Sequence, residues 1–519
     1  MSRINSNIPS MTAQVNLAQN NRDLDVRLQR LATGLRINRG ADDPAGLIVS
    51  ERLRSDIRGA EQGIKNSERA SSVIATTEGA ISEINELLNS IRSLVVEAAN
   101  TGAFSKEERE ANQLQIDSAI DSITRIANTA NFGGLKLLNG ERDYQLSGLA
   151  TSAISHAKIL GASFIGGSSV PVEVDVLASA QTGALYLRGD LPTPGAGGNG
   201  TVLSTTTIRV QGPEGVQEFQ FLSGTAYSKI AQAINDTSQL TGVKAELLNG
   251  NAASGIRFHT ENYGSDAMVS VERVGGPSTP SADWWATYKL DDSAAVASGA
   301  PFPWASYTIT ANSDKGRNVQ ALVNGNLATG DGLKIKTRTP TLSMDLLLHE
   351  DLATDPSATA STFTVTGGGS LFQLGPEVNA SQQSSIGVPA TSASQLGATL
   401  VNGELQFLSS LKSGAGNSLK ELSDRGDFTG ASKILENSID EVTVVRGRLG
   451  AFERNVLEPN IRSLQTSVEN LSASESRIRD ADFAYETSKL TRAQILSSAA
   501  TSTLALANQQ SQQVLQLLG

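Results

Sequence analysis

The chain has 519 residues, a formal net charge of −11 and no cysteine, and 4% of its residues are aromatic. At the ~100 to 200 residues of an ordinary domain, this length predicts about three domains. The chain is acidic and has no Lys/Arg-rich tract, so it lacks the basic surface of a nucleic-acid or membrane-surface binder. Without cysteine it has no disulfides and no thiolate sites.

The first predicted helix lies near the N-terminus. The opening residues MSRINSNIPSM contain no apolar stretch of leader length, and no run in the chain approaches the ~18 apolar residues of a membrane span, which by itself indicates a cytoplasmic protein. Leucines spaced 7, 4, 3 and 4 residues apart then predict one seam of a helix: Leu17, Leu24, Leu28, Leu31 and Leu35.

A break and a second helix follow. Asp43 before Pro44 is a helix start signal, because the carboxylate accepts hydrogen bonds from free amides and proline has no amide to lose. We therefore expect a break between Gly40 and Pro44. The second helix carries its own apolar seam: Ile74, Ile81, Ile84, Leu88, Ile91 and Val95.

The middle of the chain, from about 141 to 404, predicts β-structure. Gly, Pro, Thr and Ser clusters divide it into short runs of alternating polarity. Within it, Thr205–Glu246 predicts a strand, a Gly-rich turn, a second strand and a short amphipathic helix.

The C-terminal part returns to helical periodicity. One stripe contains Val442, Val445, Leu449, Phe452 and Val456. After a phase slip of one residue, a second stripe contains Leu457, Ile461, Leu464, Val468, Leu471 and Ile478. Pro459 lies at the slip and predicts a kink. The last helix has a thinner seam: Ala493, Leu496, Ala500, Ala507, Val514 and Leu517.

The thin seams at both ends predict assembly. A lone helix whose seam contains alanine, threonine and glutamine buries too little apolar area to offset its ordering entropy. We therefore expect both termini to be disordered in the isolated chain and to fold against partners. The alternative is an intramolecular bundle, which shows the same stripes. The occurrence of seams at both extremes around a β-rich insert favours assembly.

Several blocks of residues resemble a known family. LATGLRINRGADDPAG spans Leu31 to Gly46, TTEGA begins at Thr76, EIN at Glu83 and NFGGLKLLNG at Asn131. At the other end, SRIRDADFA begins at Ser476, LTRAQIL at Leu490, ALANQ at Ala505 and VLQLL at Val514. In this order the blocks resemble the two ends of bacterial flagellins, and Thr205–Glu246 resembles a hairpin and helix module of the same family.

The resemblance implies an α+β fold in which long N- and C-terminal helices form a coiled-coil or helical-bundle core around a β-rich, outward-facing insert. It implies a core helix over 1–43, core-domain parts over 44–195 and 401–479, surface domains over 196–400, and a terminal core helix over 480–519. The implied function is a self-polymerising subunit of the flagellar filament for swimming, without a cofactor and without nucleic-acid or membrane partners.

The resemblance also implies partners. These are other copies of the chain, the flagellar cap, a junction protein, an export chaperone and the flagellar type III export apparatus. A further implied partner is the Toll-like flagellin receptor, whose contact helix corresponds to about Asn89–Val96. Arg92 and Leu94 match its pattern, but Ser90 and Ser93 replace charged residues, so we expect weakened recognition.

Catalytic and metal-binding patterns are weak. The three histidines, His156, His259 and His349, are far apart in sequence. His349-Glu350 starts an H-E-x-x-H zinc pattern, but Ala353 replaces the second histidine. Capping and solvated turns explain the aspartates Asp42, Asp43, Asp480 and Asp482 better than acid/base chemistry does. The sequence therefore predicts a chain that is not an enzyme.

Two alternatives stay open. A hook-filament junction protein shares both ends in outline, although the terminal block through Leu518 fits flagellins better. A β-domain protein that binds glycans on a helical scaffold is the alternative from another class.

Overall fold

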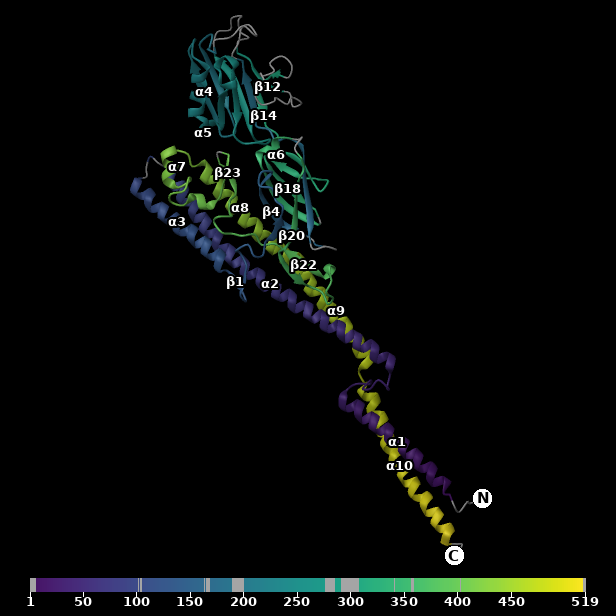
Figure 1. Ribbon diagram of the computed structural model, residues 1–519. Helices are drawn as coiled ribbons and strands as arrows, with labels where there is room; N and C mark the ends of the chain where they lie inside the picture. The colour runs from purple at the N-terminus through teal and green to yellow at the C-terminus, as the bar shows by residue number, and fades with distance from the viewer. Residues whose placement is uncertain are drawn as a thin grey trace. The chain divides into compact units, whose positions relative to one another are not determined.

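The chain has an α+β fold with long helices at both ends and a β-rich middle, as the sequence predicts (Figure 1). The computed structural model describes residues 6–100, 102, 105–162, 164, 169–188, 200–275, 285–290, 308–339, 341–355, 359–401 and 403–516. The chain divides into two compact units. Unit 1 comprises Met1–Ser71, Phe372–Gln383 and Phe452–Gly519, and unit 2 comprises Ser72–Leu371 and Ser384–Ala451. The predicted domain boundaries stay predictions.

The start of helix α2 (Pro44–Ala98) confirms the capping prediction. The Asp43 carboxylate accepts a hydrogen bond from the Gly46 amide at 2.9 Å, and Pro44 is the first helical residue. Helix α1 (Ile8–Thr33) ends earlier than the predicted break, because Gly34 adopts a left-handed conformation with φ +71°. The connection therefore spans the ten residues 34–43 rather than a short turn at Gly40.

A π-helical turn explains the phase slip in the C-terminal seam. Helix α8 (Thr429–Phe452) continues into a π turn at Glu453–Leu457 and then into α9 (Glu458–Arg479). A π turn closes its hydrogen bonds over one more residue than an α turn, so it shifts the apolar stripe by one residue. Pro459, the second residue of α9, follows this irregularity directly, and the helix continues through it without a break. The predicted kink stays a prediction.

Segment Phe372–Gln383 packs closely against α2 in unit 1. A Cβ atom on Gly59 would lie 2.7 Å from the Cβ of Pro376, and one on Gly63 would lie 2.8 Å from the Leu374 carbonyl oxygen. Real side chains do not tolerate such distances. The two glycines therefore permit this backbone approach.

Two asparagine amides fix the same segment. Asn460 of α9 donates from Nδ2 to the Leu374 carbonyl at 2.9 Å, and Asn66 of α2 donates to the Gln373 carbonyl at 3.1 Å. Carbonyl groups of an irregular segment need such partners when they are covered.

The helical part of unit 2 buries the second predicted seam. The six apolar residues of α2 from Ile74 to Val95 each expose 3% of their surface or less. Helix α3 (Lys106–Thr129) adds buried Ile116, Ile120 and Ile123, and it begins with a capping box between Ser105 and Glu108. Helices α7 (Leu419–Arg425) and α8 complete this part with buried Leu422, Val442, Val445 and Leu449.

The first β-rich core consists of two antiparallel sheets with the strand orders β16-β15-β5-β20-β3 and β17-β18-β19-β4. On β5, Val172, Val174 and Val176 are buried, while Glu173 between the first two is exposed, which is the alternation of a sheet with one buried face. The strands are β3 (Tyr144–Ser147), β4 (Ile154–Ala162), β5 (Val170–Ala178), β15 (Gln320–Val323), β16 (Asn326–Leu327), β17 (Thr329–Asp331), β18 (Lys334–Arg338), β19 (Leu342–Leu348) and β20 (Ser361–Gly368), with the short helix α6 (Glu350–Thr354) after β19.

The second β-rich core has sheets of order β13-β12-β6-β10-β9 and β14-β11-β7-β8. Its helix α4 (Tyr227–Asp236) contributes buried Ile230 and Ile234 to the apolar cluster. The other elements are β6 (Ala184–Leu187), β7 (Thr206–Gln211), β8 (Val216–Phe221), α5 (Ser238–Thr241), β9 (Val243–Leu247), β10 (Ile256–Thr260), β11 (Met268–Gly275), β12 (Thr287–Leu290), β13 (Thr308–Thr310) and β14 (Ser313–Lys315).

Short strands occupy the remaining connections. β1 pairs with β2, and β23 pairs with β24, each as a small antiparallel hairpin, while β21 and β22 flank segment Phe372–Gln383. Their bounds are β1 (Asn131–Phe132), β2 (Leu135–Lys136), β21 (Ser370–Gln373), β22 (Gln383–Ile386), β23 (Thr399–Val401) and β24 (Glu404–Gln406).

The hairpin and helix module at Thr205–Glu246 is confirmed. β7 and β8 pair antiparallel from Thr206↔Phe221 to Gln211↔Val216, and α4 follows. The Asn235 side chain then joins the helix to β9, because its amide donates to the Ala245 carbonyl at 2.9 Å and its oxygen accepts from the Ala245 amide at 2.7 Å. This two-way hydrogen bond explains why an asparagine follows Ile234 in the module.

Acid should destabilise the second β-rich core through His259. Burial, reinforced by the nearby cations Arg257 and Lys244, lowers the pKa of His259 to about 4. An unfolded histidine titrates near pH 6.5, so between pH 6.5 and 4 the unfolded state binds more protons and stability falls as the pH falls. We expect the wild type to lose on the order of 2 kcal/mol more than His259→Gln over this range, measured by calorimetry of the full chain. Parallel pH profiles of the two proteins would contradict this.

Candidate assembly surface

Helices α1 and α10 (Phe483–Gln516) lie side by side and run antiparallel in unit 1 (Figure 1). Near the chain ends, Asn7 donates to the Ala507 carbonyl at 3.1 Å, and Ser10 contacts Asn508 at 2.8 Å. Halfway along, Asn20 donates to the Leu496 carbonyl at 3.3 Å. These polar side chains therefore fix the register of the two helices.

A buried carboxylate of one helix contacts two arginines of the other. Glu486 of α10 exposes 3% of its surface, and its oxygens lie 3.0 Å from Arg27 and 3.1 Å from Arg30 of α1. Asp23 lies 3.0 Å from Arg27 on its other side. Burial lowers the pKa of the Arg27 guanidinium, but hydrogen bonds to Glu486 and Asp23 outweigh it and raise that pKa overall.

The connections next to these helices are also joined. The Arg36 amide donates to the Arg479 carbonyl at 2.6 Å, and the Ala481 amide donates to the Gly34 carbonyl at 2.9 Å. The Asp42 carboxylate accepts hydrogen bonds from the Asn38 and Arg39 amides, and that of Arg39 is the main reason for its lowered pKa. Hydrogen bonds that close the turn before α2 therefore account for Asp42.

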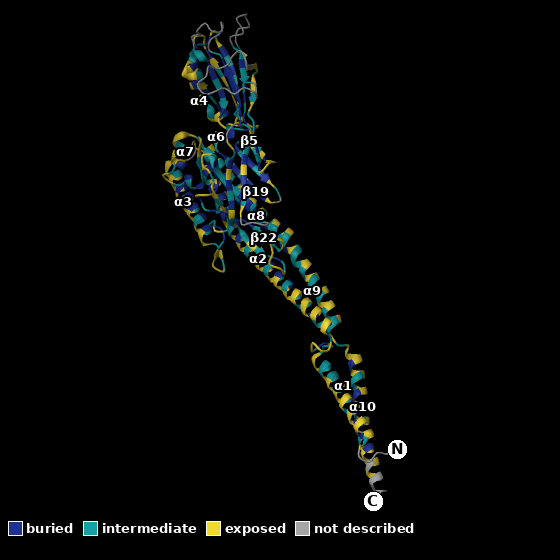
Figure 2. Cartoon of the chain, turned by 45° about the vertical axis from the view of Figure 1, so that its right-hand side comes forward, coloured by how far each residue is buried: buried dark blue, intermediate teal, exposed yellow. Residues whose placement is uncertain are grey.

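The α1–α10 pair leaves apolar side chains uncovered. Ile8, Met11 and Val15 expose 52%, 62% and 65% of their surfaces. Their spacing of three and four residues places them on one face of α1, opposite the face of buried Ala13. On α10, Ile495 and Leu506 are similarly exposed. Figure 2 shows how much of these two helices is exposed. We call Ile8, Met11 and Val15 the α1 stripe.

The predicted packing residues separate into two groups. Leu17, Leu24, Leu31, Leu35 and Ala500 are half-buried, Leu28 and Leu496 are exposed, and Ala507 is buried. Leu88, Ile91 and Val95 are buried inside unit 2 by the chain's own helices, so this fold uses them within the subunit. Val514 lies in α10 without a described side chain, and Leu517 lies outside the described residues.

Glu486 and the α1 stripe were not predicted from the sequence. The 3–4 spacing of Ile8, Met11 and Val15 was a usable signal for the stripe. For Glu486 no local signal existed, because its partners lie more than 450 residues away.

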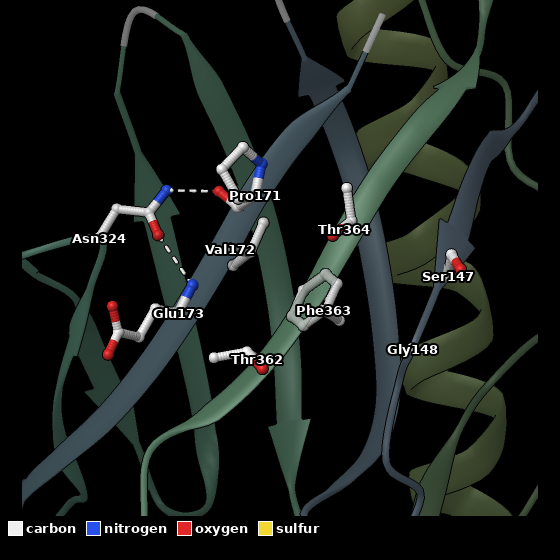
Figure 3. A pocket seen from close by; sticks show the side chains of 9 residues that line it. All are labelled: Ser147, Gly148, Pro171, Val172, Glu173, Asn324, Thr362, Phe363 and Thr364. Atoms are coloured by element: carbon white, nitrogen blue, oxygen red, sulfur yellow. Dashed lines mark hydrogen bonds between the residues drawn. The ribbon is translucent and has the colours of Figure 1, made fainter.

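A shallow pocket lies on the first β-rich core (Figure 3). The Asn324 amide is already engaged there, since it donates to the Pro171 carbonyl at 2.9 Å and accepts from the Glu173 amide at 2.8 Å. Glu173 is the only carboxylate in the lining and has no acid/base partner among the lining residues. These are Ser147, Gly148, Pro171, Val172, Glu173, Asn324, Thr362, Phe363 and Thr364.

The histidines have structural surroundings. His156 packs edge-on against Phe407 with ring centroids 6.2 Å apart, and burial lowers its pKa. His349 accepts a hydrogen bond from the Asp351 amide at the start of α6. Within the described ranges, no three metal-ligating side chains cluster, and no helix has the length and apolarity to cross a bilayer.

Both ends of the chain match family models. Residues 4–143 match the bacterial flagellin N-terminal helical region, and residues 432–518 match the bacterial flagellin C-terminal helical region. The flagellin of Escherichia coli (strain K12) is 30% identical over 99% of both chains, and that of Salmonella muenchen is 28% identical over 99% of both. The solved structure of FliC from Burkholderia pseudomallei covers 74% of this chain and 99% of that chain, with 14% identity and a TM-score of 0.23, too low to inform the fold.

Proposed function

The chain belongs to the flagellin family, whose members form the extracellular bacterial flagellar filament, and from this premise we propose that the α1–α10 pair carries its main subunit contacts. The observation that supports the proposal is the α1 stripe, which the subunit itself leaves uncovered. By contrast, the seam from Ile74 to Val95 is buried by the subunit's own fold. The role is structural rather than catalytic.

Assembly completes the folding of the ends. In the isolated subunit, α1 and α10 share a seam of alanines, polar residues and leucines that are only half-buried, which is too thin to hold both helices ordered. Covering the α1 stripe with a neighbouring copy adds the missing apolar burial. The contact joins unlike surfaces, so it propagates as a helical tube instead of closing into a ring.

Substitution in the α1 stripe should weaken polymerisation selectively. We expect Met11→Asp with Val15→Asp to raise the critical concentration at least about 10-fold, because the loss of apolar burial plus a buried charge exceeds 1.4 kcal/mol. Asn16→Asp is the matched control, since exposed Asn16 lies on α1 off the stripe. Sedimentation of seeded protein measures both. Equal critical concentrations in the double variant and the control would refute this use of the stripe.

Export and tip addition complete the proposed pathway. Ends that are disordered alone, together with the absence of disulfides, suit threading through the narrow flagellar type III channel, with an export chaperone covering the ends beforehand. At the tip, the cap protein would oversee addition, and a junction protein would connect the first subunits to the hook. The β-rich cores would face outwards. Long homopolymers of the purified chain would separate this function from that of a junction protein.

Weak stimulation of the Toll-like flagellin receptor is a further expectation. Arg92 is exposed on α2 and Leu94 is half-buried, but Ser90 and Ser93 replace the charges of the recognised pattern. Purified monomer should therefore activate receptor reporter cells less potently than the Salmonella flagellin does. Arg92→Ala should reduce the remaining signal, whereas Arg52→Ala, an exposed arginine elsewhere on α2, should not. Full potency of the wild-type monomer would contradict the expectation.

A further inference from the structure

Strand β8 is an edge strand in the part of the second β-rich core that the structure describes. It ends the sheet order β14-β11-β7-β8, and among the described residues its backbone ladder joins it to β7 alone. Its sequence is VQEFQF, without the lysine, proline or bulge that proteins use to block edge pairing. Among the described residues, no strand pairs with its outer side, and α5 approaches the turn before β8, where a Cβ atom on Gly215 would lie 2.6 Å from the Leu240 carbonyl oxygen.

Exposed apolar side chains stand at both ends of this edge. Val216, the first residue of β8, exposes 51% of its surface, and Leu222, directly after β8, exposes 68%. Between them, Glu218 bonds to Arg209 of β7 at 2.8 Å, so the edge carries no unpaired charge.

These features point to a specific partner, a second copy of β8. Two identical strands can pair antiparallel about a two-fold axis perpendicular to the sheet, and residues on one face then meet residues on the same face. In the register centred on Phe219, Val216 meets Leu222 of the other copy, and Glu218 meets Gln220. The first pair buries apolar surface, and the second joins an amide donor to a carboxylate.

The neighbouring registers are less favourable. Centring the pair on Glu218 places two carboxylates directly opposite each other, which is destabilising. Centring it on Gln220 places Glu218 opposite Leu222, which leaves a carboxylate against an apolar side chain. On the exposed face of β8, the register centred on Phe219 is the one that pairs the apolar side chains with each other and the carboxylate with an amide.

We propose that β8 edges join two copies of this chain through an antiparallel strand pair centred on Phe219. The contact is isologous, unlike the head-to-tail contact that propagates a filament. A polar filament has no two-fold axes between its own subunits, so in the polymer this contact links chains of different filaments. It is independent of the α1 stripe.

Cysteine trapping tests the register, because the chain has no cysteine of its own. Full-length V216C and L222C monomers are mixed under mild oxidation and run on a non-reducing gel. The mixture should give a disulfide-linked dimer at several times the yield of either variant alone, since residues 216 of the two copies are about 20 Å apart. The matched control is V216C mixed with L327C, because Leu327 is as exposed as Leu222 but lies on β16.

A charge substitution supplies a second measurement that leaves the fold intact. Gln220 is exposed, and Gln220→Glu in both cysteine variants would oppose Glu218 of the other copy with a like charge. The linked dimer should then fall to the control yield, whereas Gln220→Asn should retain it. A V216C and L222C yield no higher than the control, or one that Gln220→Glu leaves unchanged, would overturn the proposal.

Discussion

Removal of residues 490–519 is expected to abolish polymerisation while unit 2 stays folded. The truncation removes the part of α10 that contacts Asn7, which caps α1, and Ser10 and Asn20 of α1. Glu486 remains, but the part of α1 that carries the α1 stripe then has no helix to pair with. Negative-stain imaging and sedimentation of seeded protein should detect no polymer, and circular dichroism should retain the β-rich and α2–α3 signal.

The control removes the second β-rich core without touching the chain ends. Gln181 and Arg317 exchange backbone hydrogen bonds at 2.9 and 3.0 Å where the chain enters and leaves the second β-rich core. Replacing residues 182–316 with Asn-Gly should therefore close a hairpin there. A wider deletion, such as 150–400, would also remove Phe372–Gln383, which belongs to unit 1. Polymerisation by the 490–519 truncation, or its loss in the control, would contradict our assignment of the assembly surface.

Removing both arginines around Glu486 should have the next largest effect. Arg27→Leu with Arg30→Leu leaves a carboxylate that exposes 3% of its surface without a cation. Breaking a buried ion pair in this way costs about 3–5 kcal/mol. When this free energy is lost only in the polymer, where the two helices are paired, the critical concentration should rise at least about 100-fold. Seeded sedimentation across a concentration series measures this rise.

The triple variant separates pairing from packing. Adding Glu486→Leu to the two arginine substitutions replaces the ion triad with apolar side chains, an exchange that is often neutral or stabilising. Polymerisation should then recover most of the lost affinity. A triple variant as impaired as the double one would show that the arginines act through contacts other than Glu486.

Capping and periodicity were predictable because they depend on neighbours along the chain. The Asp43 carboxylate accepts a hydrogen bond from an amide three residues away, so the start of α2 could be predicted from Asp43 and Pro44 alone. The seam from Ile74 to Val95 follows from 3.6 residues per turn, whatever covers it. The phase slip before Leu457 was visible as well, although its cause, a π turn, was not.

Tertiary structure decided what each apolar or charged face meets. Periodicity predicts an apolar face for the α1 stripe and for Leu88 alike, but only the fold shows that the chain's own helices cover Leu88 and leave Met11 exposed. The sequence around Glu486 is that of any exposed helix position, and only antiparallel pairing brings its carboxylate to Arg27 and Arg30. The need for glycine at positions 59 and 63 is likewise visible only in the fold, where a distant segment packs on them. Local hydrogen bonds and the helical repeat determine the helices of this chain. Burial and ion pairing depend on residues that are far away in the sequence, so only the tertiary structure shows them.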